Sequence, residues 1–317
     1  MSTPTLLLTH RLTPDIASDL HAELANHLPD GALARARTPE ETFELLPEAD
    51  GIVTAGLSED LLDSATSLRW VQVLSAGVDQ YDQDALEARD IALTNASGVH
   101  AEPIAEQVLW FLLTFERRLH VGVRQQSRGV WERFEGGELR GKTLGIIGVG
   151  AIGTRVAELG SGLGMTVLGT KRTVETAPTV LDDCFAADDH HEVLRRADYV
   201  VLACPLTDET EGLLGSEEFR LMPSDAVLVN IARGDVVDED ALIRALQYRL
   251  IRGAGLDVFS TEPLPSDSPL WNLSNAVLTP HMAGSTPHKA ERWQDIIVEN
   301  YEVLASDKVD EMVNRIV

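Results

Sequence analysis

Short apolar runs alternate with helical patterns along the first hundred residues. The runs are bounded by polar or turn-forming residues and are predicted as strands, which span 5–10, 51–56, 70–74 and 91–95. This alternation is typical of a parallel sheet that is covered by helices. A long, largely apolar helix is then predicted over 101–119, because Pro103 stands near its start and basic residues stand at its end.

A second and stronger alternation follows residue 142. Its predicted strands span 143–148, 166–170, 199–204, 226–231, 253–258 and 276–280. Six strands with intervening helices predict a complete dinucleotide-binding sheet. A further helix is predicted from Lys289, and its C-terminal place allows it to pack back on the N-terminal part of the chain.

The expected fold class is therefore α/β, with two Rossmann-like parallel-sheet domains and a cleft between them. The first would be a flavodoxin-like, substrate-binding domain made of residues 1–98 and 288–317. The second would be a dinucleotide-binding domain made of residues 99–287. A chain of 317 residues agrees with two domains, since one compact core rarely holds so many.

The segment "GIIGVGAIG" carries a glycine pattern that is weak evidence alone, because glycine marks many turns. Here it follows a predicted strand and begins a predicted helix, which is the context of a dinucleotide site. Gly148 would form the tight turn, Gly150 would admit a pyrophosphate, and Gly153 would let the helix pack on the strand. The helix start at Ala151 and Ile152 would face the phosphates.

The end of the next predicted strand distinguishes between two nicotinamide cofactors. An NAD site expects an acid about 20 residues beyond the glycine loop, where it accepts a hydrogen bond from the ribose 2′-hydroxyl. This chain instead has Lys171, Arg172 and Thr173 there. Two cations and a hydroxyl suit a 2′-phosphate, although a solvated basic pair is the alternative. We expect NADPH as the preferred cofactor and NADH as a second one that the site could accept.

The net charge is the unusual feature of the composition. Lysine and arginine number 26 against 51 acidic residues, which gives −25, and the acids are spread along the chain. Such a field repels nucleic acid and anionic membranes, so neither is an expected partner. At 1 M salt a Debye length of about 3 Å would screen the self-repulsion. We therefore expect a salt-adapted, halophilic enzyme, with an ordinary acidic protein as the alternative.

The chain has two cysteines, Cys184 and Cys204, which exclude a disulfide framework and a four-cysteine zinc site. Its N-terminal leucine run is too short for a signal peptide, and no stretch approaches a membrane span. A cytoplasmic protein is expected. His190 and His191 lack metal-ligand spacing and are expected at the surface, so no metal site is predicted.

Three chemically capable side chains stand at predicted strand ends of the second sheet: Arg233, Glu262 and His281. Taken singly, each has an ordinary explanation as a turn residue, a solvated carboxylate or a loop histidine. Ligands of open parallel sheets bind beyond the carboxyl ends of the strands, so all three would face one crevice. After Arg233, Gly234 would let the backbone turn, and a capped helix is predicted to start within 235–242.

The chain resembles the D-isomer-specific 2-hydroxyacid dehydrogenase family over nearly its whole length. The resemblance is densest in "GIIGVGAIG", "DYVVLACPLTDETEGLL", "LVNIARGDVVDEDAL", "GLDVFSTEPLP" and "LTPHMAGST". It implies that Arg233, Glu262 and His281 are catalytic, and that Ala76 and Gly77 of "SAGVD" bind the substrate carboxylate through their N–H groups. The further cofactor contacts that it implies are Cys204, Pro205, Ile231, Ala232, Asp257 and Gly284.

The chemistry of the family needs these residue types. Arg233 would hold the carboxylate and carbonyl oxygens of a 2-oxo acid while the nicotinamide gives its hydride. His281 as imidazolium would protonate the new alkoxide and would also contact the substrate. Glu262 would fix the ring tautomer and favour the protonated form. The resemblance also implies D-2-hydroxy acid products and a homodimer.

The exact reaction has alternatives. No regulatory domain of the phosphoglycerate dehydrogenase kind is expected after Val317, which favours a broad 2-oxo acid reductase over a dedicated enzyme of that kind. A narrow NADPH-dependent glyoxylate or hydroxypyruvate reductase is the alternative within the class. Formate dehydrogenases pair the histidine with glutamine, whereas this chain has Glu262. Corepressors that use this fold as a nucleotide-gated binding module resemble NAD binders, so Lys171 and Arg172 argue against them.

Overall fold

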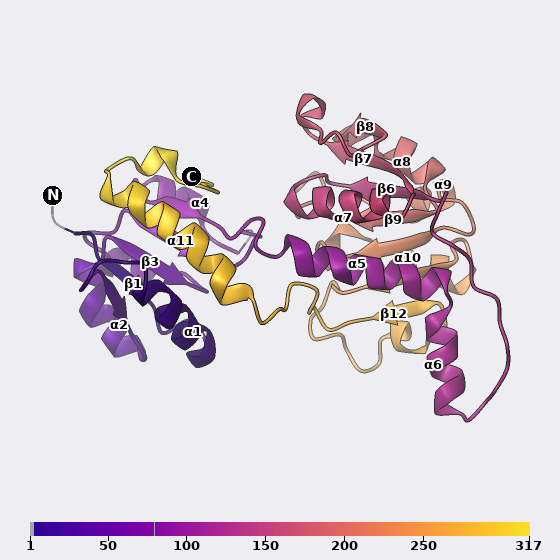
Figure 1. Cartoon of the computed structure of the whole chain (residues 1–317), viewed down its shortest axis with the longest axis horizontal. Helices are drawn as coiled ribbons and strands as arrows, with labels where there is room; N and C mark the ends of the chain where they lie inside the picture. The colour runs from indigo at the N-terminus through magenta and orange to yellow at the C-terminus, as the bar shows by residue number, and fades with distance from the viewer. Residues whose placement is uncertain (1–2, 79) are drawn as a thin grey trace. The chain divides into compact units, whose positions relative to one another are not determined.

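The structure is a computed structural model that describes residues 3–78 and 80–317 (Figure 1). The chain forms two compact units. The first comprises the N-terminal part as far as His100 together with Thr286–Val317, and the second is Ala101–Ser285. No helix within the described residues is both long and apolar enough to cross a membrane.

The first unit is built on a sheet of five parallel strands. These strands are β1 (Leu6–Leu8), β2 (Leu33–Arg35), β3 (Gly51–Thr54), β4 (Trp70–Val73) and β5 (Ala92–Thr94). Their order, β2-β1-β3-β4-β5, is that of flavodoxin-like folds. The chain crosses over after β2, because β1 lies between β2 and β3.

Helices cover both faces of this sheet. They are α1 (Pro14–Ala25), α2 (Pro39–Leu45), α3 (Glu59–Ser64), α4 (Gln83–Glu87) and α11 (Lys289–Ala305). Alternate residues of β1 point to opposite faces, so Leu6 and Leu8 join the core under α1 and α11, whereas Leu7 joins the core under α3. Figure 1 shows α11, in yellow, beside α1, so the C-terminal helix completes the N-terminal sheet.

The second unit is built on seven parallel strands. They are β6 (Thr143–Ile147), β7 (Thr166–Lys171), β8 (Asp183–Ala186), β9 (Tyr199–Leu202), β10 (Val227–Asn230), β11 (Gly253–Leu256) and β12 (Ala276–Leu278). Their order is β12-β11-β10-β9-β6-β7-β8. This is the Rossmann order with one further strand, and the direction of winding reverses between β6 and β9.

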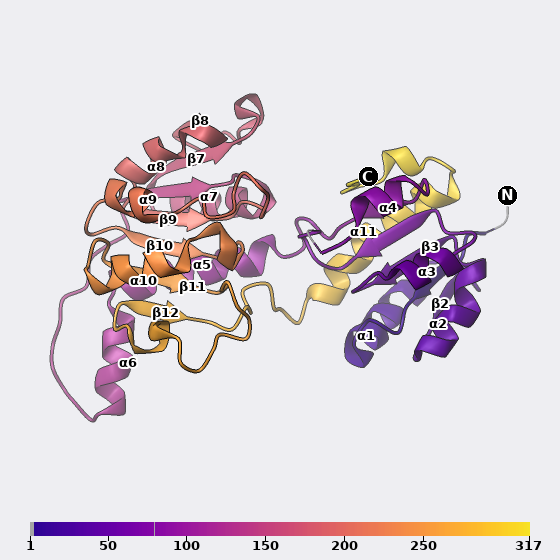
Figure 2. The ribbon, with the colours of Figure 1, turned by 180° about the vertical axis from the view of Figure 1, so that it is seen from behind.

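Two helix layers enclose this sheet (Figure 2). Apolar residues of α5 (Ala101–Glu116) and α7 (Ala151–Gly162) share one core with the sheet. Apolar residues of α8 (His190–Arg196), α9 (Ser216–Leu221) and α10 (Glu239–Gln247) share the other core. Because the strands are covered on both faces, their side chains form nearly continuous apolar runs, and this is why periodicity finds them.

The two predicted parallel-sheet α/β domains are confirmed, and two details of the prediction are wrong. The strands β2 and β8 were not predicted, because they are short edge strands with half-buried, partly charged sequences. The helix predicted over 101–119 ends at Glu116, since Arg118 adopts a left-handed conformation with φ 54° and α6 (Leu119–Ser127) begins after it.

The capped helix predicted to start within 235–242 is confirmed. Residues Gly234–Val236 form a short 3-10 turn, and α10 starts at Glu239. Between them, Val237 pairs with Leu214 in an isolated bridge and has an extended backbone. Asp238 then caps α10, with its side chain accepting a hydrogen bond of 2.9 Å from the Ala241 N–H.

Candidate active site

The glycine-rich loop lies at the point where the winding of the second sheet reverses. It follows β6 and begins α7, with Gly150 at the N-cap and Ala151 and Ile152 in the first turn. Gly148 has φ 93°, and a Cβ atom there would lie 2.6 Å from the Cys204 backbone, which follows β9. Both the left-handed backbone and this close approach require glycine. Gly153 packs against the carbonyl of Gly148 in the same way.

A pocket of about 230 Å³ adjoins this loop, beside the carboxyl ends of β6, β7 and β9. The predicted cofactor residues that line it are Gly148, Lys171, Arg172, Cys204 and Pro205. Lys171 is half-buried, and its Nζ donates a hydrogen bond of 2.8 Å to the Val149 carbonyl. Thr173 is exposed and does not line the pocket.

Nine residues of the pocket wall were not predicted as cofactor contacts, and three of them are titratable. Asp188 and Glu209 are exposed acids, and His190 is the first residue of α8. Asp188 and His190 follow the missed strand β8, so no sequence signal placed them here. The prediction that His190 lies at the surface is wrong: the residue is 9% exposed, because α8 packs against β6, β7 and α9.

Cys204 lies at the end of β9, in the wall of the same pocket. Burial raises the pKa of its thiol to about 11. The thiol is therefore neutral at physiological pH, and Cys204 contributes an apolar surface rather than a nucleophile or a metal ligand.

The turn that carries Arg233 is organised by Asn230, the last residue of β10. Asn230 is buried, and its side chain accepts a hydrogen bond of 3.0 Å from the Ala232 N–H and donates one of 2.9 Å to the Arg233 carbonyl. Arg233 itself is half-buried, and its Nη1 donates to the Ala232 carbonyl at 2.8 Å. The single polar residue in an otherwise apolar strand thus shapes the arginine turn.

Gly234 brings this turn against the loop after β11. A Cβ atom at Gly234 would lie 1.9 Å from the carbonyl carbon of Phe259 and 2.2 Å from the Ser260 nitrogen. The glycine therefore serves a close backbone approach at the start of the 3-10 turn. Since β10 and β11 are neighbours, Gly234 couples the arginine turn to the loop that carries Glu262.

Glu262 and His281 meet across the loops that follow the neighbouring strands β11 and β12. The Glu262 Oε2 atom lies 2.7 Å from the His281 Nδ1 atom. The other carboxylate oxygen, Oε1, accepts a hydrogen bond of 3.0 Å from the Phe259 N–H. Side-chain exposure is 34% for Glu262 and 53% for His281, so the pair is accessible to a small ligand.

Asp257 holds the loop that carries His281. It is 1% exposed, and its carboxylate accepts hydrogen bonds from the Thr279 hydroxyl at 2.5 Å, the Met282 N–H at 3.0 Å and the Ala283 N–H at 2.9 Å. His281 has φ 48°, a conformation that costs about 1–2 kcal/mol for a residue with a side chain. The buried carboxylate stabilises this conformation, a role that the sequence interpretation missed.

The other predicted contacts are placed as follows. Ile231 and Ala232 are buried at the end of β10, and Gly284 is half-buried in the loop after β12. Ala76 and Gly77 are half-buried in the first unit, after β4, where their carbonyls accept hydrogen bonds from Asn95 at 2.6 Å and Ser75 at 2.7 Å. No hydrogen bond within the described residues uses the N–H groups of Ala76 or Gly77. The last residue of "SAGVD", Asp79, lies outside the described residues.

The arrangement in the second unit has a defined chemical capacity. The loops after three neighbouring strands, β10, β11 and β12, carry a cation, a carboxylate and an imidazole at the carboxyl edge of one sheet. The glycine loop after β6, in the same sheet, can bind a dinucleotide phosphate. The His–Glu pair can donate and accept a proton, and the arginine can bind an anionic substrate group.

Two relatives resemble most of the chain in sequence. Glyoxylate/hydroxypyruvate reductase B of Yersinia pestis is 36% identical over 288 residues, which cover 87% of each protein. D-3-phosphoglycerate dehydrogenase of Methanocaldococcus jannaschii is 34% identical over 288 residues, which cover 89% of this chain. The chain spans about half of that second relative, 55% of its length.

Two crystal structures resemble it in fold. A D-isomer specific 2-hydroxyacid dehydrogenase family protein of Aeromonas salmonicida has a TM-score of 0.85 at 32% identity and covers 100% of this chain and 99% of that one. A D-isomer specific 2-hydroxyacid dehydrogenase of Xanthobacter autotrophicus, in complex with NADPH and MES, has a TM-score of 0.85 at 29% identity and covers 100% of this chain and 98% of that one.

The protein-family model for the NAD binding domain of D-isomer specific 2-hydroxyacid dehydrogenases matches residues 109–283 of this chain, which is more than half of its length. These residues lie within the second unit and contain the glycine loop, Arg233, Glu262 and His281. The chain belongs to the D-isomer specific 2-hydroxyacid dehydrogenase family.

Proposed function

We propose that this chain reduces 2-oxo acids to D-2-hydroxy acids, and catalyses the reverse reaction, with His281 as the proton donor. The observation that carries the proposal is the contact of 2.7 Å between Glu262 Oε2 and His281 Nδ1. The loop that carries Glu262 lies beside the turn that carries Arg233. The experiment is a panel of 2-oxo acids, including glyoxylate, hydroxypyruvate and 2-ketoisocaproate, with NADPH or NADH, in which oxidation of the cofactor is followed by absorbance.

The residues present fit a dinucleotide, because a Cβ atom at Gly150 would point into open space at the start of α7. The reduced nicotinamide supplies the hydride when it is bound. Arg233 binds the carboxylate and polarises the carbonyl oxygen of the substrate by charge-assisted hydrogen bonds. Ala76 and Gly77 of the first unit would supply N–H groups to the same carboxylate.

His281 holds the transferred proton at its Nε2 atom. Its Nδ1–H donates to Glu262, so the ring presents Nε2 toward the substrate. The alkoxide that forms on hydride transfer takes this proton, and the reverse reaction returns it. Glu262 is fixed in turn by the Phe259 N–H, which limits its rotation.

The proposed preference for NADPH rests on Lys171, Arg172 and Thr173 at the end of β7. Lys171 and Arg172 line the pocket beside the glycine loop, and the similar structure from Xanthobacter autotrophicus contains NADPH. Asp188 and Glu209 in the same wall oppose this preference, whereas Lys171 and Arg172 favour it because both can form charge-assisted hydrogen bonds with a 2′-phosphate. NADH is then the weaker of two accepted cofactors.

A narrow glyoxylate or hydroxypyruvate reductase is the second candidate. It is favoured by the 36% identity to the Yersinia pestis protein of that name. The substrate panel distinguishes the two: a broad enzyme reduces 2-ketoisocaproate at a rate comparable with glyoxylate, and a narrow one does not.

For either candidate we propose a cytoplasmic location. Two free thiols, Cys184 and Cys204, agree with a reducing compartment.

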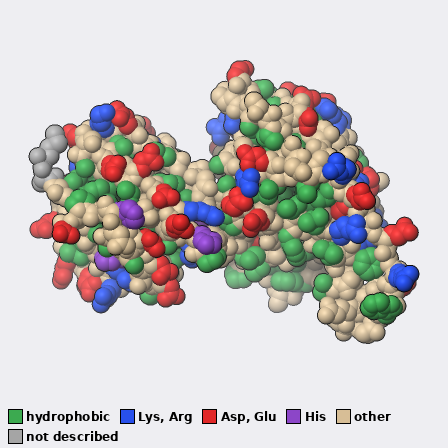
Figure 3. All heavy atoms as spheres, in the orientation of Figure 1, with side chains coloured by type: hydrophobic (Ala, Val, Ile, Leu, Met, Phe, Trp, Pro, Cys, Tyr) green, Lys and Arg blue, Asp and Glu red, His purple; other side chains and the backbone are tan. Residues whose placement is uncertain are grey.

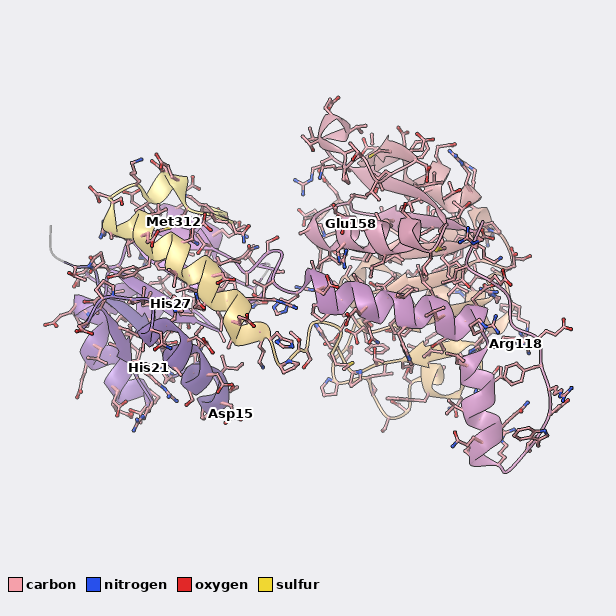
Figure 4. The ribbon with its side chains drawn as sticks, viewed as in Figure 1. Asp15, His21, His27, Arg118, Glu158 and Met312 are labelled. Atoms are coloured by element: carbon pink, nitrogen blue, oxygen red, sulfur yellow. The ribbon has the colours of Figure 1, made fainter. Side chains whose placement is uncertain are left out.

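The proposed homodimer is supported by an exposed apolar arm, α6 with the loop after it, which projects from the rest of the second unit (Figure 1). Its exposed large apolar side chains are those of Leu119, Val123, Val130, Trp131 and Phe134, and Trp131 is 95% exposed. Arg118, labelled in Figure 4, lies 5.7 Å from the centroid of the Phe134 ring and holds the arm together. By contrast, α5 buries most of its apolar residues in the core. Sedimentation of Trp131→Ser should show monomers where the wild type shows dimers.

Salt adaptation is supported by the acidic surface. Figure 3 shows Asp and Glu side chains on both units, in agreement with the net charge of −25. Screening of this charge should raise the denaturation midpoint as KCl rises to molar concentration. If the midpoint did not rise, the salt-adaptation hypothesis would be wrong.

A further inference from the structure

A second cluster of titratable side chains lies between α8 and α9, outside the catalytic loops. It consists of His190 and His191, the first two residues of α8, and Glu218 of α9. One potential ligand atom from each lies within 4.8 Å of the other two. The His191 Nε2 atom is 3.4 Å from the Glu218 Oε1 atom, and the two imidazole rings lie with their centroids 4.3 Å apart.

His190 gives the second, independent observation. The residue is 9% exposed, and neither of its ring nitrogens makes a hydrogen bond of normal length and angle within the described residues, although the backbone of Ala187 is near. A histidine buried for packing alone normally donates its ring N–H to a carbonyl or a carboxylate, and unsatisfied buried polar atoms are rare in folded proteins. At least one nitrogen of His190 therefore lacks the partner that burial requires.

A metal ion is the partner that this cluster fits. Two imidazole nitrogens and one carboxylate oxygen form a common donor set for Zn²⁺, which then takes a water as its fourth ligand. We propose that His190, His191 and Glu218 bind one Zn²⁺ ion or a similar divalent transition metal. The site was not foreseen in the sequence, because adjacent histidines have no recognised ligand spacing and Glu218 lies on another helix.

The surroundings of Glu218 orient it for this task. Its Oε2 atom accepts a hydrogen bond of 2.9 Å from the Gly215 N–H, which leaves Oε1 directed to His191. An outer contact of this kind, a hydrogen bond to a metal ligand from a group that does not itself bind the metal, fixes the carboxylate before the metal binds. The ion would join the start of α8 to α9 and so stabilise the second unit.

The test is titration of the chelator-treated, full-length protein with Zn²⁺ by calorimetry, and with Co²⁺ by absorption spectroscopy. The expected result is one ion per chain, a rise in the thermal midpoint, and Co²⁺ bands of a tetrahedral site. Loss of an outer contact already weakens metal binding roughly 10- to 100-fold. We therefore expect His191→Ala and Glu218→Gln each to weaken Zn²⁺ binding at least roughly 10-fold.

Two controls make the result specific. His288 and Glu291 form an exposed pair with 3.7 Å between Nδ1 and Oε2 and no third ligand in the described cluster, so His288→Ala should leave Zn²⁺ affinity unchanged. Glu262→Gln removes the carboxylate of a third pair, His281 with Glu262, and should leave the stoichiometry at one. Circular dichroism of each metal-free variant checks its fold. Absence of stoichiometric binding, or equal affinity in the wild type, His191→Ala and Glu218→Gln, would overturn the proposal.

Discussion

Glu262 and His281 share a contact of 2.7 Å between Oε2 and Nδ1, although they lie on loops from two different parallel strands. The contact depends on three supports: the Phe259 N–H on the carboxylate, the buried Asp257 beneath the histidine loop, and the close approach at Gly234. The catalytic proposal therefore predicts effects for residues that do not touch the substrate as well as for those that do.

Glu262→Gln should lower kcat for 2-oxo acid reduction. The carboxylate oxygen accepts a hydrogen bond from His281 Nδ1, and an amide can turn its NH₂ group to that nitrogen, so the ring loses the acceptor that orients it. The measurement is kcat, with NADPH affinity as a second readout that should not change. The matched control is Glu239→Gln, since Glu239 Oε2 accepts hydrogen bonds from Ser260 of the same loop but does not reach His281. Equal kcat for the wild type and Glu262→Gln would show that the pair has no catalytic part.

Asp257→Asn should destabilise the enzyme and lower kcat. One of the two side-chain oxygens becomes an NH₂ group, which faces either the Met282 or the Ala283 N–H and leaves a buried donor unpaired. The expected loss is about 1–3 kcal/mol in the free energy of unfolding, measured by denaturant titration. Asp267→Asn, an exposed change nearby in sequence, is the control. Wild-type stability and activity of Asp257→Asn would contradict the positioning role.

Gly234→Ala should reduce both stability and kcat, because its methyl group would overlap the Phe259 carbonyl carbon at 1.9 Å. Overpacking of this kind typically costs about 1–3 kcal/mol, and the displaced loop carries Glu262. Gly162→Ala is the matched control, since a Cβ atom there meets nothing within 4 Å and the residue ends α7. If the two variants behaved alike in unfolding and in turnover, the close approach would have no consequence for the site.

Arg172→Ala should weaken NADPH binding roughly 10-fold and change NADH binding little, because only NADPH carries the 2′-phosphate. Arg172 is a cleaner probe than Lys171, whose Nζ also supports the glycine loop through the Val149 carbonyl and so affects both cofactors. Fluorescence titration with each cofactor gives the two dissociation constants. Arg220→Ala, on α9, is the control for an exposed arginine that does not line the pocket. Equal losses for NADPH and NADH would contradict the cofactor assignment.

The sequence predicted the parts of the molecule that depend on periodic burial. Strands such as β10, covered on both faces, produce apolar runs that periodicity detects, and the glycine loop has a fixed place after the first strand of its unit. The short edge strand β8 has no such signal, because Asp183 and its neighbours are half exposed. As a result, the pocket wall that follows β8 was not predicted.

Contacts between loops could not be predicted from local pattern. Nothing in the sequence around Asn230 or Asp257 distinguishes a buried polar residue that shapes a turn from one that binds a ligand. The distinction depends on which N–H groups the fold brings within hydrogen-bonding distance. The same holds for His190, whose burial is decided by the packing of α8 against its neighbours.

The most direct test of the catalytic proposal compares the wild type with His281→Ala in NADPH oxidation by a 2-oxo acid, with NADPH affinity measured for both. Loss of a general acid typically lowers kcat about 10²- to 10⁴-fold, whereas NADPH binding should change less than about twofold. The catalytic proposal predicts both results, the fall in kcat and the nearly unchanged NADPH binding. Failure of the wild type to consume NADPH with any 2-oxo acid, or full activity of His281→Ala, would contradict it.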